Sequence, residues 1–224
     1  MYRSSDHQKI TPNATDAFGA TYDDSNSMYD TQNDYGVITF DGNVTTIGDW
    51  AFTNSTTLTA VAWPNTVTDI GYEAFKGCTS LTKLTVKAGS IGGEAFKNCT
   101  NLQTITFGID VTSIVNNAFS NCPNVTSVKF SGVVVLNDAS LNGVGTAASP
   151  VALNLPYNWP AKDRLVDSTT TWHGGYFNCE YADPVKEFLG EMGEPCTDCP
   201  VVEIKKGDKT VRLYNPEKVE FKKE

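Results

Sequence analysis

The sequence predicts an α/β repeat solenoid, rich in β-strand with short helical turns, followed by a small C-terminal unit of one helix and a β-hairpin. The first observation is a motif that occurs four times between residues 44 and 130. Its copies are Ile47-Gly-Asp-Trp-Ala-Phe52, Ile70-Gly-Tyr-Glu-Ala-Phe75, Ile91-Gly-Gly-Glu-Ala-Phe96 and Ile114-Val-Asn-Asn-Ala-Phe119. The second observation is their spacing, because successive phenylalanines are 23, 21 and 23 residues apart. A period of that size is typical of stacked supersecondary units that share one core.

Each copy is predicted to contain two strands joined by a turn. A short strand leads in, over residues 44–47, 67–70 and 111–114 in three of the copies. The segment that ends in Ala-Phe is predicted to form one helical or 3₁₀ turn, with Ala and Phe pointing inward. A longer β-rich run then follows, and its four copies cover residues 58–63, 81–86, 102–107 and 125–130.

One position of the repeat holds a cysteine in three copies and a serine in the first. The residues are Ser55, Cys78, Cys99 and Cys122, each three residues after the Phe. A solenoid stacks equivalent positions on successive coils, so these cysteines are expected to be small buried apolar groups.

The longer strands predict a polar surface. Their apolar residues fall at positions one, four and six, so the side chains between them must point out of the coil. The outward rows are Ala60, Lys83, Thr104 and Ser127, and beside them Ala62, Thr85, Thr106 and Lys129. Neighbouring strands lie about 5 Å apart, which makes these rows a flat, hydroxyl-rich surface. The candidate ligand-binding residues are Lys83, Thr85, Thr104, Thr106, Ser127 and Lys129.

The repeated pattern Ile-Gly-x-x-Ala-Phe-x-x-Cys-x-x-Leu-x-x-Leu-x-Val resembles the BspA-like leucine-rich repeat, found in surface proteins of gut and oral bacteria. The lead-in segments Lys9–Pro12, Asp16–Ala20 and Gly36–Gly42 also resemble the stretch that precedes such repeats, so the match extends over residues 9 to 160. The resemblance implies a right-handed, leucine-rich-repeat-like solenoid with a β-sheet on one face. It also implies exposure at a cell surface and a role in attachment or protein binding.

The N-terminal region, residues 1–43, is expected to supply a hairpin, a loop and a capping strand. The hairpin is predicted within residues 2–12, and the capping strand is Gly36–Gly42. Residues 13–35 show no helical or strand period and are expected to be an extended or looped segment over the end of the solenoid. Four carboxylates in this region suggest a calcium site as an alternative to a solvated acidic loop, although their spacing fits no EF-hand. They are Asp23, Asp24, Asp30 and Asp34.

The solenoid, residues 44–160, is expected to end in a degenerate fifth repeat. Ala139 keeps the repeat's Ala, Leu141 replaces the Phe, and Val151–Leu155 forms a final strand. Prolines at 150, 156 and 160 are expected to stop further strand pairing. The aromatic residues of segment 157–178 are expected to close the apolar end of the solenoid, and stacking on sugars is the functional alternative.

Residues 161–224 are predicted to form a C-terminal cap, a short helix and a β-hairpin tail. The helix covers residues 183–192, with Asp183 as N-cap and Pro184 at the first helical position. Apolar and polar residues alternate on both sides of Lys206–Lys209, which predicts the hairpin, and a last strand is expected around residues 218–221.

Three further cysteines, Cys179, Cys196 and Cys199, lie near the C-terminus. With His173 they make up a set of four zinc ligands, but the spacing is not that of a zinc ribbon. A redox dithiol would need a thioredoxin-like context, which is missing. In an exported protein a disulfide among these three cysteines is the simpler interpretation, and reduced structural thiols remain the other. No metal or other cofactor is predicted.

Catalytic arrangements find little support, so the chain is predicted not to be an enzyme. The two histidines, His7 and His173, lie in no nucleophile-elbow context. Glu73 and Glu94 share one repeat position, each three residues before a lysine, which indicates exposed ion pairing rather than a pair of glycosidase carboxylates. The sequence contains no phosphate loop, dinucleotide fingerprint or HExxH motif.

Net charge and hydropathy disfavour several classes of partner. The formal net charge of −9 and the pI near 4.7 disfavour nucleic acid and anionic membrane surfaces. No apolar run approaches the roughly 20 residues needed to cross a bilayer, and the N-terminus does not resemble a signal peptide. Either the protein is not exported or this is a mature or excised part.

These observations predict a non-catalytic, cell-surface or extracellular protein that binds or adheres to another protein, or to a glycan, through the exposed solenoid face. The alternative is a structural spacer or assembly module of a surface or virion-like particle. Frame residues are shared by all copies of the repeat, so the sequence names neither the ligand nor the oligomeric state.

Overall fold

The computed structural model describes residues 1–15, 17–156, 159 and 171–181, and the backbone of three strands between residues 202 and 223. Contacts divide the chain into two units, Met1–Ala182 and Asp183–Glu224. All regular elements of the described residues are β-strands, so this part of the molecule is a β-solenoid with a small separate sheet.

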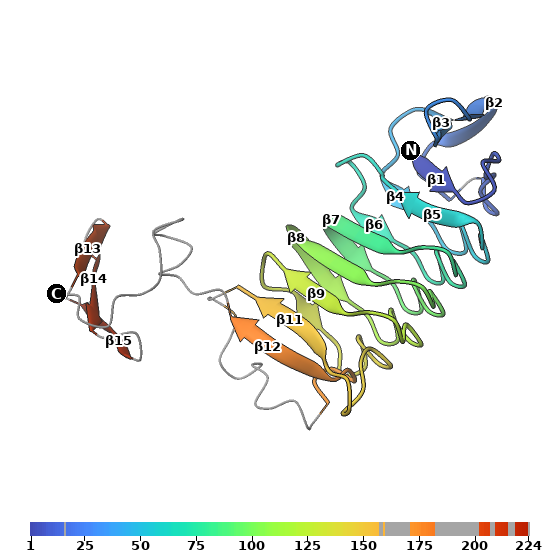
Figure 1. Ribbon diagram of the computed structural model, residues 1–224. Coiled ribbons are helices and arrows are strands. Elements are labelled where there is room, and N and C mark those ends of the chain that lie inside the picture. Colours follow the sequence, from blue (N-terminus) through green and yellow to red (C-terminus); the bar gives the residue numbers. More distant parts are fainter. Residues whose placement is uncertain are drawn as a thin grey trace. The chain divides into compact units, whose positions relative to one another are not determined.

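The first unit contains strands β1 to β12 (Figure 1). Those of the N-terminal end and first coil are β1 (Tyr2–Ser4), β2 (Thr21–Asp30), β3 (Tyr35–Asp41), β4 (Thr46–Ile47) and β5 (Leu58–Val61). Those of the later coils are β6 (Asp69–Ile70), β7 (Lys83–Ile91), β8 (Thr104–Ile114), β9 (Ser127–Phe130), β10 (Val135–Leu136), β11 (Val151–Leu155) and β12 (Phe177–Tyr181). We number the coils one to four by Phe52, Phe75, Phe96 and Phe119, and coil five by Leu141.

The solenoid is held by one parallel sheet, in the order β12-β11-β9-β8-β7-β6-β4, with β10 beside β8. Its register repeats from coil to coil, because Leu84 lies opposite Ile105 and Ile105 opposite Val128. In coils two and three the longer strand runs on into the lead-in of the next coil, which gives one long strand, β7 or β8. Equivalent residues of the repeat therefore stack on one another, as the period of 21 to 23 residues requires.

The wall that carries the Ala-Phe motifs is built from turns. This turn wall consists of residues 48–55, 71–78, 92–99 and 115–122. Its backbone N–H groups alternate between two kinds of acceptor. Thr53 N donates to Trp50 O within the coil at 3.1 Å, whereas Phe52 N donates to Ala74 O of the next coil at 2.7 Å.

The predicted helical or 3₁₀ turn is therefore wrong. A helix needs right-handed backbone angles and its own carbonyls as acceptors. Here the next coil accepts every second N–H, and two residues per coil take a left-handed conformation. The first is Trp50, Glu73, Glu94 or Asn117, with φ between 53° and 61°, and the second, four residues later, is Asn54, Gly77, Asn98 or Asn121. The Ala and Phe of each motif do point inward, as expected, with exposed fractions of 0–5%.

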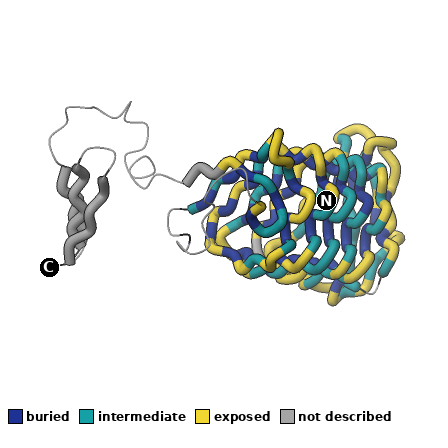
Figure 2. Tube along the Cα trace, turned by 90° about the horizontal axis from the view of Figure 1, so that it is seen from below, coloured by how far each residue is buried: buried dark blue, intermediate teal, exposed yellow. Residues whose placement is uncertain are grey.

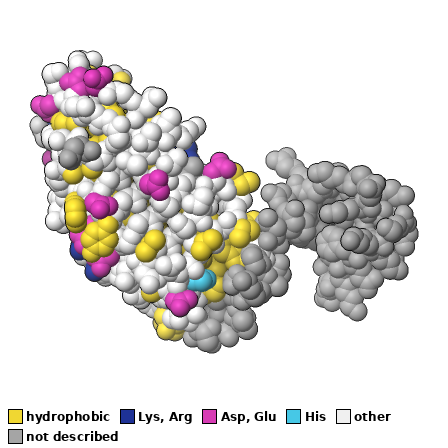
Figure 3. Space-filling view, turned by 180° about the vertical axis from the view of Figure 1, so that it is seen from behind, with side chains coloured by type: hydrophobic (Ala, Val, Ile, Leu, Met, Phe, Trp, Pro, Cys, Tyr) yellow, Lys and Arg dark blue, Asp and Glu magenta, His cyan; other side chains and the backbone are white. Residues whose placement is uncertain are grey.

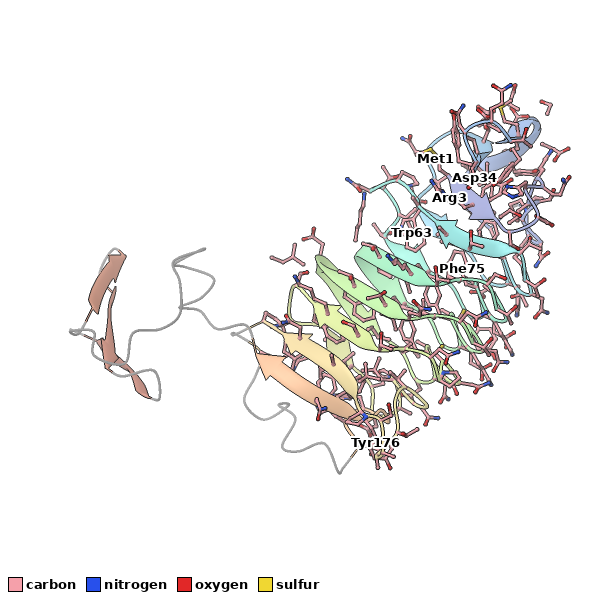
Figure 4. All side chains as sticks on the ribbon, viewed as in Figure 1. Met1, Arg3, Asp34, Trp63, Phe75 and Tyr176 are labelled. Atoms are coloured by element: carbon pink, nitrogen blue, oxygen red, sulfur yellow. The ribbon has the colours of Figure 1, made fainter. Side chains whose placement is uncertain are left out.

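Stacked aromatic rings form the centre of the core, and Figure 2 shows buried residues recurring on every coil. The phenylalanines of coils one to four stack with ring centroids 5.1–5.2 Å apart. Trp63, beyond strand β5, stacks on Phe75 at 5.9 Å, and Figure 4 shows the two side chains together. Because each ring contacts one above and one below, the column links all four coils in a single core.

The three repeat cysteines form a second column, which confirms the expected burial. Cys78, Cys99 and Cys122 are fully buried and free. Each thiol donates to the carbonyl of the Phe in the preceding coil, with Sγ to O distances of 3.2–3.3 Å. A small group with a weak donor fits a position that faces a backbone carbonyl inside the core.

The N-terminal end differs from the prediction. Residues 2–12 do not form a hairpin with one another, because β1 pairs antiparallel with β3 and β5. Residues 21–30, expected to lack strand structure, form β2, which pairs antiparallel with β3 in a four-stranded sheet of order β2-β3-β1-β5. The strand predicted at Gly36–Gly42 is confirmed as β3. Strand β2 has no apolar alternation, since Ser27 is its one buried residue.

The phenylalanine column continues into the N-terminal segment. Phe18 packs against Phe52 at 5.9 Å and against Phe40 at 4.6 Å. Figure 4 shows Met1, Arg3 and Asp34 at the same end, where the Arg3 guanidinium lies 4.0 Å from the Asp34 carboxylate. The residues before coil one thus cover its apolar flank, which an isolated repeat would expose.

The fifth coil keeps the frame with different residues from those predicted. Ser140, not Ala139, takes the place of the repeat's Ala: it is fully buried, and its hydroxyl donates to Ile114 O at 2.6 Å. Leu141 takes the place of the Phe, and Val144 stands where the cysteine is expected. The deviation is conservative, because each substitute is small or apolar enough for the same buried place.

The prolines do not end the sheet. Strand β12 pairs parallel with β11 over five residues, from Val151 opposite Phe177 to Leu155 opposite Tyr181. Pro150 and Pro156 lie just outside β11 and remove no donor from its ladder. Beyond β9, three aromatic residues of the end segment are buried and pack together, which confirms their closing role for the described residues. They are Trp159, Trp172 and Phe177.

The second unit contains a three-stranded antiparallel sheet of β13 (Val202–Lys206), β14 (Lys209–Tyr214) and β15 (Lys218–Lys223). Lys206 lies opposite Lys209, which confirms the predicted hairpin, and β15 confirms the predicted last strand. The helix predicted at residues 183–192 lies outside the described residues, as do Cys196 and Cys199.

Candidate functional site on the strand face

The predicted site residues lie in two straight rows across adjacent strands. In the first row Lys83 of β7 lies opposite Thr104 of β8, which lies opposite Ser127 of β9. In the second row Thr85, Thr106 and Lys129 occupy the same three strands two residues further on. We call these rows, with their continuation on β11, the strand face. The structure thus brings all six predicted residues together.

The rows point outward because their neighbours point inward. Leu84, Ile105 and Val128, which separate the two rows, are at most 2% exposed. Lys83, Thr85 and Lys129 are exposed. The other three residues of the rows, Thr104, Thr106 and Ser127, are half-buried. Successive side chains of a strand alternate between the two sides of the sheet, so burial of one set fixes exposure of the other.

The strand face continues further than predicted at its C-terminal side. Ala152 and Asn154 of β11 lie opposite Ser127 and Lys129, and Asn178 of β12 lies opposite Ala152. The alternation in Val151–Leu155 already indicated that Ala152 and Asn154 point outward. Strand β12 had no comparable signal, because the prolines before it suggested an end to strand pairing.

At its N-terminal side the face begins later than predicted. Ala60 was expected to continue the row of Lys83, but β5 pairs with β1, and Ala60 lies opposite Arg3. The Ala62 N–H donates to Met1 O at 2.8 Å. These residues therefore belong to the N-terminal sheet, and the regular rows start at β7.

The strand face differs in charge from the rest of the chain. Among its described side chains the charged ones are Lys83 and Lys129, and beyond the two rows Lys87 follows on β7 and the exposed Asp110 on β8. Lys87 Nζ donates to Asn65 Oδ1 at 3.1 Å. The whole chain carries a formal charge of −9, so this face is a basic area on an acidic protein.

The four carboxylates of the N-terminal segment, considered above as a calcium site, each bond to separate partners. Asp23 accepts from Ser25 and Asn26, Asp24 pairs with Lys9 at 2.5 Å, and Asp30 accepts from Asn33. Asp34 accepts from Tyr29 and from His7. These hydrogen bonds lower the pKa of all four carboxyls. No group of three or more potential metal ligands occurs in the part of the chain that the structure describes.

The two repeat glutamates form ion pairs, as predicted, but the pairs are half-buried rather than exposed, and the structure adds a link between coils. Lys76 Nζ lies 2.7 Å from Glu73 and 3.1 Å from Glu94, and Lys97 Nζ lies 2.9 Å from Glu94. Hydrogen bonds to Glu73 and Glu94 raise the pKa of Lys76, and those from Lys97 and Lys76 lower the pKa of Glu94. Because a lysine lies between the two carboxylates, the arrangement links coils two and three of the turn wall.

The other residues considered for catalysis or metal binding are the cysteines and His173. Burial raises the pKa of Cys78 and of Cys122 to about 12, so these thiols are protonated at neutral pH and are poor nucleophiles. His173 Nδ1 lies 2.9 Å from Asn137 O. Cys179 lies on β12 by its backbone, but its side chain, Cys196 and Cys199 are outside the described residues.

A comparison with family models identifies the repeat. The family model described as BspA type leucine rich repeat region, in six copies, matches residues 25–143, which is more than half of the chain. The chain belongs to the BspA-type leucine-rich repeat family. Proteins of this family are typically found at surfaces, and leucine-rich repeats generally mediate protein–protein interaction. No curated protein and no solved structure matches the chain significantly.

The family match also extends beyond the four copies that the sequence pattern revealed. It begins within β2, includes β3 of the N-terminal sheet, and ends at Gly143 in the fifth coil. The described residues form no helix, hence none long and apolar enough to span a membrane. Repeat solenoids of this kind are typically non-catalytic.

Proposed function

We propose that this BspA-type protein is a non-catalytic, cell-surface binding or adhesion protein, and that its strand face contacts an acidic surface of a partner protein. The observation that carries the proposal is the pair of lysines, Lys83 and Lys129, at opposite corners of a flat hydroxyl-rich sheet. Complementary charge steers association and selects partners, so a basic face on a protein of net charge −9 favours an acidic partner.

Hydroxyl and amide side chains suit the same role. Each of these side chains is able both to donate and to accept a hydrogen bond, and its position is fixed by the sheet beneath it. The residues are Thr85, Thr104, Thr106, Ser127 and Asn154. Side chains held on a rigid scaffold lose little freedom on binding. A contact surface that is ordered before the partner arrives therefore supports specific recognition.

The test is a peptide array that presents acidic, neutral and basic sequences to the purified protein. We expect the wild type to bind acidic peptides and the variant Lys83→Glu/Lys129→Glu to bind them roughly tenfold more weakly or not at all, because like charges then face each other. Beads coated with the wild-type protein should also attach to surfaces that display the selected peptides.

A matched control places negative charge elsewhere on the coils. Thr68→Glu/Thr112→Glu changes two exposed threonines outside the strand face and should leave the acidic-peptide profile nearly unchanged. If both double variants lose binding equally, net charge alone explains the effect and the proposal fails. Binding of neutral glycans that is insensitive to both variants would make the protein a glycan binder instead.

The second unit supports one alternative, an assembly or spacer module. Its strands β13 to β15 pair with one another, and contacts group them apart from Met1–Ala182. Under this alternative, deletion of residues 183–224 abolishes multimers measured by light scattering and leaves peptide binding intact. Under the binding proposal, the same deletion leaves both the acidic-peptide profile and its dependence on Lys83 and Lys129 unchanged.

A further inference from the structure

A second surface of the first unit carries chemistry that the strand face does not use. A groove of about 580 Å³ lies where Ala14, Ala17 and Gly19 approach the turns of coils one and two. The side chains that give it chemical character are Asp49, Trp50 and Asp69. Figure 3 shows a face on which large hydrophobic side chains lie beside acidic ones, next to a broad area of uncharged polar atoms.

The aromatic part of this surface is exposed although it is large. Trp50 and Tyr72, on adjacent coils, are 52% and 42% exposed, and their rings meet edge to face with centroids 6.2 Å apart. Exposed aromatic pairs of this size are typical of binding surfaces, where they add contact area at little entropic cost.

The backbone conformation of Trp50 is a second observation that points to a binding role. Its φ is 58°, a left-handed conformation that bulky residues rarely adopt. The equivalent residues of the later coils are Glu73, Glu94 and Asn117, at similar angles. Folding therefore does not require tryptophan at this place, and half of the side chain gains nothing from burial. An unfavourable residue kept at an exposed position points to a contact outside the chain.

Both carboxylates at the groove are held in position. Asp49 Oδ1 accepts a hydrogen bond from Tyr72 N at 2.6 Å. Asp69 accepts from Thr68 Oγ1 at 2.9 Å and from the Ser90 hydroxyl. No lysine or arginine lines the groove in the described part of the chain. Its two formal negative charges thus add to the attraction that a protein of charge −9 exerts on cations.

We propose that this groove binds a lysine or arginine side chain of a partner protein. The indole face attracts a cation through its quadrupole, and the two carboxylates neutralise the cation's charge. A neutral sugar would use the rings but would gain nothing from the paired charges. The site goes beyond the proposed function, since it lies on other residues than the strand face and prefers the opposite charge.

The test uses nuclear magnetic resonance with the full chain. The probe is a short glycine-rich peptide with a single lysine, and the indole N–H signal of Trp50 reports binding. The same peptide with an acetylated lysine is the matched control, since it keeps the length and loses the charge. We expect the cationic peptide to shift the signal and to bind about fivefold or more tightly than the acetylated one. Added salt should weaken it, because the carboxylates are solvent-accessible.

Two variants separate a binding role from a structural one. Trp50→Asn keeps a residue suited to the left-handed angle, and Asp49→Asn/Asp69→Asn removes both negative charges while keeping one acceptor oxygen at each position. Each should lower peptide affinity about fivefold or more, read from the Tyr72 amide signal, without unfolding the protein. Ile109→Ala, which removes a 71% exposed side chain elsewhere, is the control and should bind as the wild type does.

Several results would overturn the assignment. Equal binding of the acetylated peptide would remove the role of charge, and a shift caused by a neutral oligosaccharide but not by the peptide would make the groove a glycan site. Loss of binding in Lys83→Glu/Lys129→Glu would place the contact on the strand face. Failure of the acidic-peptide test, by contrast, leaves this groove unaffected, because the two surfaces share no residue.

Discussion

The strand face and the turn wall are built from the same coils, yet they satisfy the backbone in different ways. On the strand face each strand bonds to its neighbours in a parallel ladder, and its residues have ordinary extended angles. On the turn wall alternate N–H groups bond within the coil and to the next coil, and two residues per coil are left-handed. Both walls have the same repeat, but only the turn wall limits which residues fit well.

The difference bears on where specificity resides. Outward positions of a strand accept many residue types at a similar cost in stability. Lys83, Thr104 and Ser127 therefore occupy equivalent positions of three adjacent strands without any change in the fold. Left-handed positions favour glycine, asparagine and aspartate, as Asn54, Gly77, Asn98 and Asn121 illustrate. Trp50, Glu73 and Glu94 depart from that preference, and Trp50 is the bulkiest of the three, whereas a lysine on the strand face is an ordinary variation.

The largest expected effect tests what the two walls share, the aromatic column between them. Phe96→Ala removes a fully buried ring that stacks on Phe75 at 5.1 Å and Phe119 at 5.2 Å. We expect the free energy of unfolding to fall by about 3–5 kcal/mol, because a cavity opens in the middle of the column. Urea denaturation monitored by circular dichroism measures it.

The matched control is Thr106→Ala, on the strand face of the same coil. It removes a half-buried hydroxyl side chain, and its effect should stay within about 0.5 kcal/mol. Similar losses in both variants would mean that the outward rows carry stability as well as contacts, and the separation of frame from contact surface would not hold.

The second prediction concerns the thiols beside the column. Burial holds the pKa of Cys122 at about 12, whereas an unfolded cysteine titrates near 8.5. The unfolded state therefore loses its proton first, and stability is complete below about pH 8.5 and declines as the pH rises toward 12. Each such thiol should lower the free energy of unfolding by about 1.4 kcal/mol per pH unit in that range.

Cys122→Val isolates this contribution, since Val144 occupies the equivalent place in coil five with full burial. Denaturation of both proteins from pH 8 to 10.5 gives the difference in slope, which cancels the titration of tyrosines and lysines. Parallel slopes would show that Cys122 ionises as readily in the folded protein as in the unfolded chain.

The sequence predicted the solenoid, its inward residues and the register of the strand face because each rests on local periodicity. Alternation within Leu81–Val86 and Leu102–Phe107 indicates which side chains are buried, and a constant period aligns Lys83 with Thr104. Such information is repeated in every copy, so single deviations such as Ser55 do not obscure it.

What the sequence did not predict depends on contacts between distant segments. Strand β2 shows no apolar alternation, and its partner β3 is recognised only in the folded sheet. The turn wall resembled a helical turn because Ala and Phe suit both, but the carbonyls of the next coil decide where the N–H groups bond. Trp50 appeared as one variable residue of the motif, and neither its exposure nor its backbone angle could be deduced from that position.

A smaller effect is expected from the ion pairs that link coils two and three across the turn wall. Lys76→Gln breaks contacts to Glu73 and Glu94, whose side chains are 15% and 21% exposed. We expect a loss of about 1 kcal/mol, the upper part of the range for such pairs. Lys97→Gln breaks a single contact and should cost about half as much, and no comparable loss should follow Lys83→Gln on the strand face.

The pH dependence provides an independent check of these pairs. The pKa of Glu94 is lowered in the folded protein, so its contribution is present above the unfolded value near 4.3 and is lost as the pH falls through the folded pKa. Lys76→Gln should therefore reduce the difference in stability between pH 6 and pH 3, measured by thermal unfolding. An unchanged difference would contradict a role for Lys76 in holding Glu94 ionised.

The smallest effect distinguishes the left-handed backbone from the side chain it carries. Trp50→Asn and Trp50→Ala both remove the edge-to-face contact with Tyr72, so that loss cancels between them. Asparagine tolerates a φ near 58° better than alanine, as Asn117 does at 61° in coil four. The Asn variant should be about 0.5–1 kcal/mol more stable than the Ala variant in urea denaturation. Equal stability would mean that the coil can relax to a right-handed angle there, and tryptophan would then need no external contact to account for it.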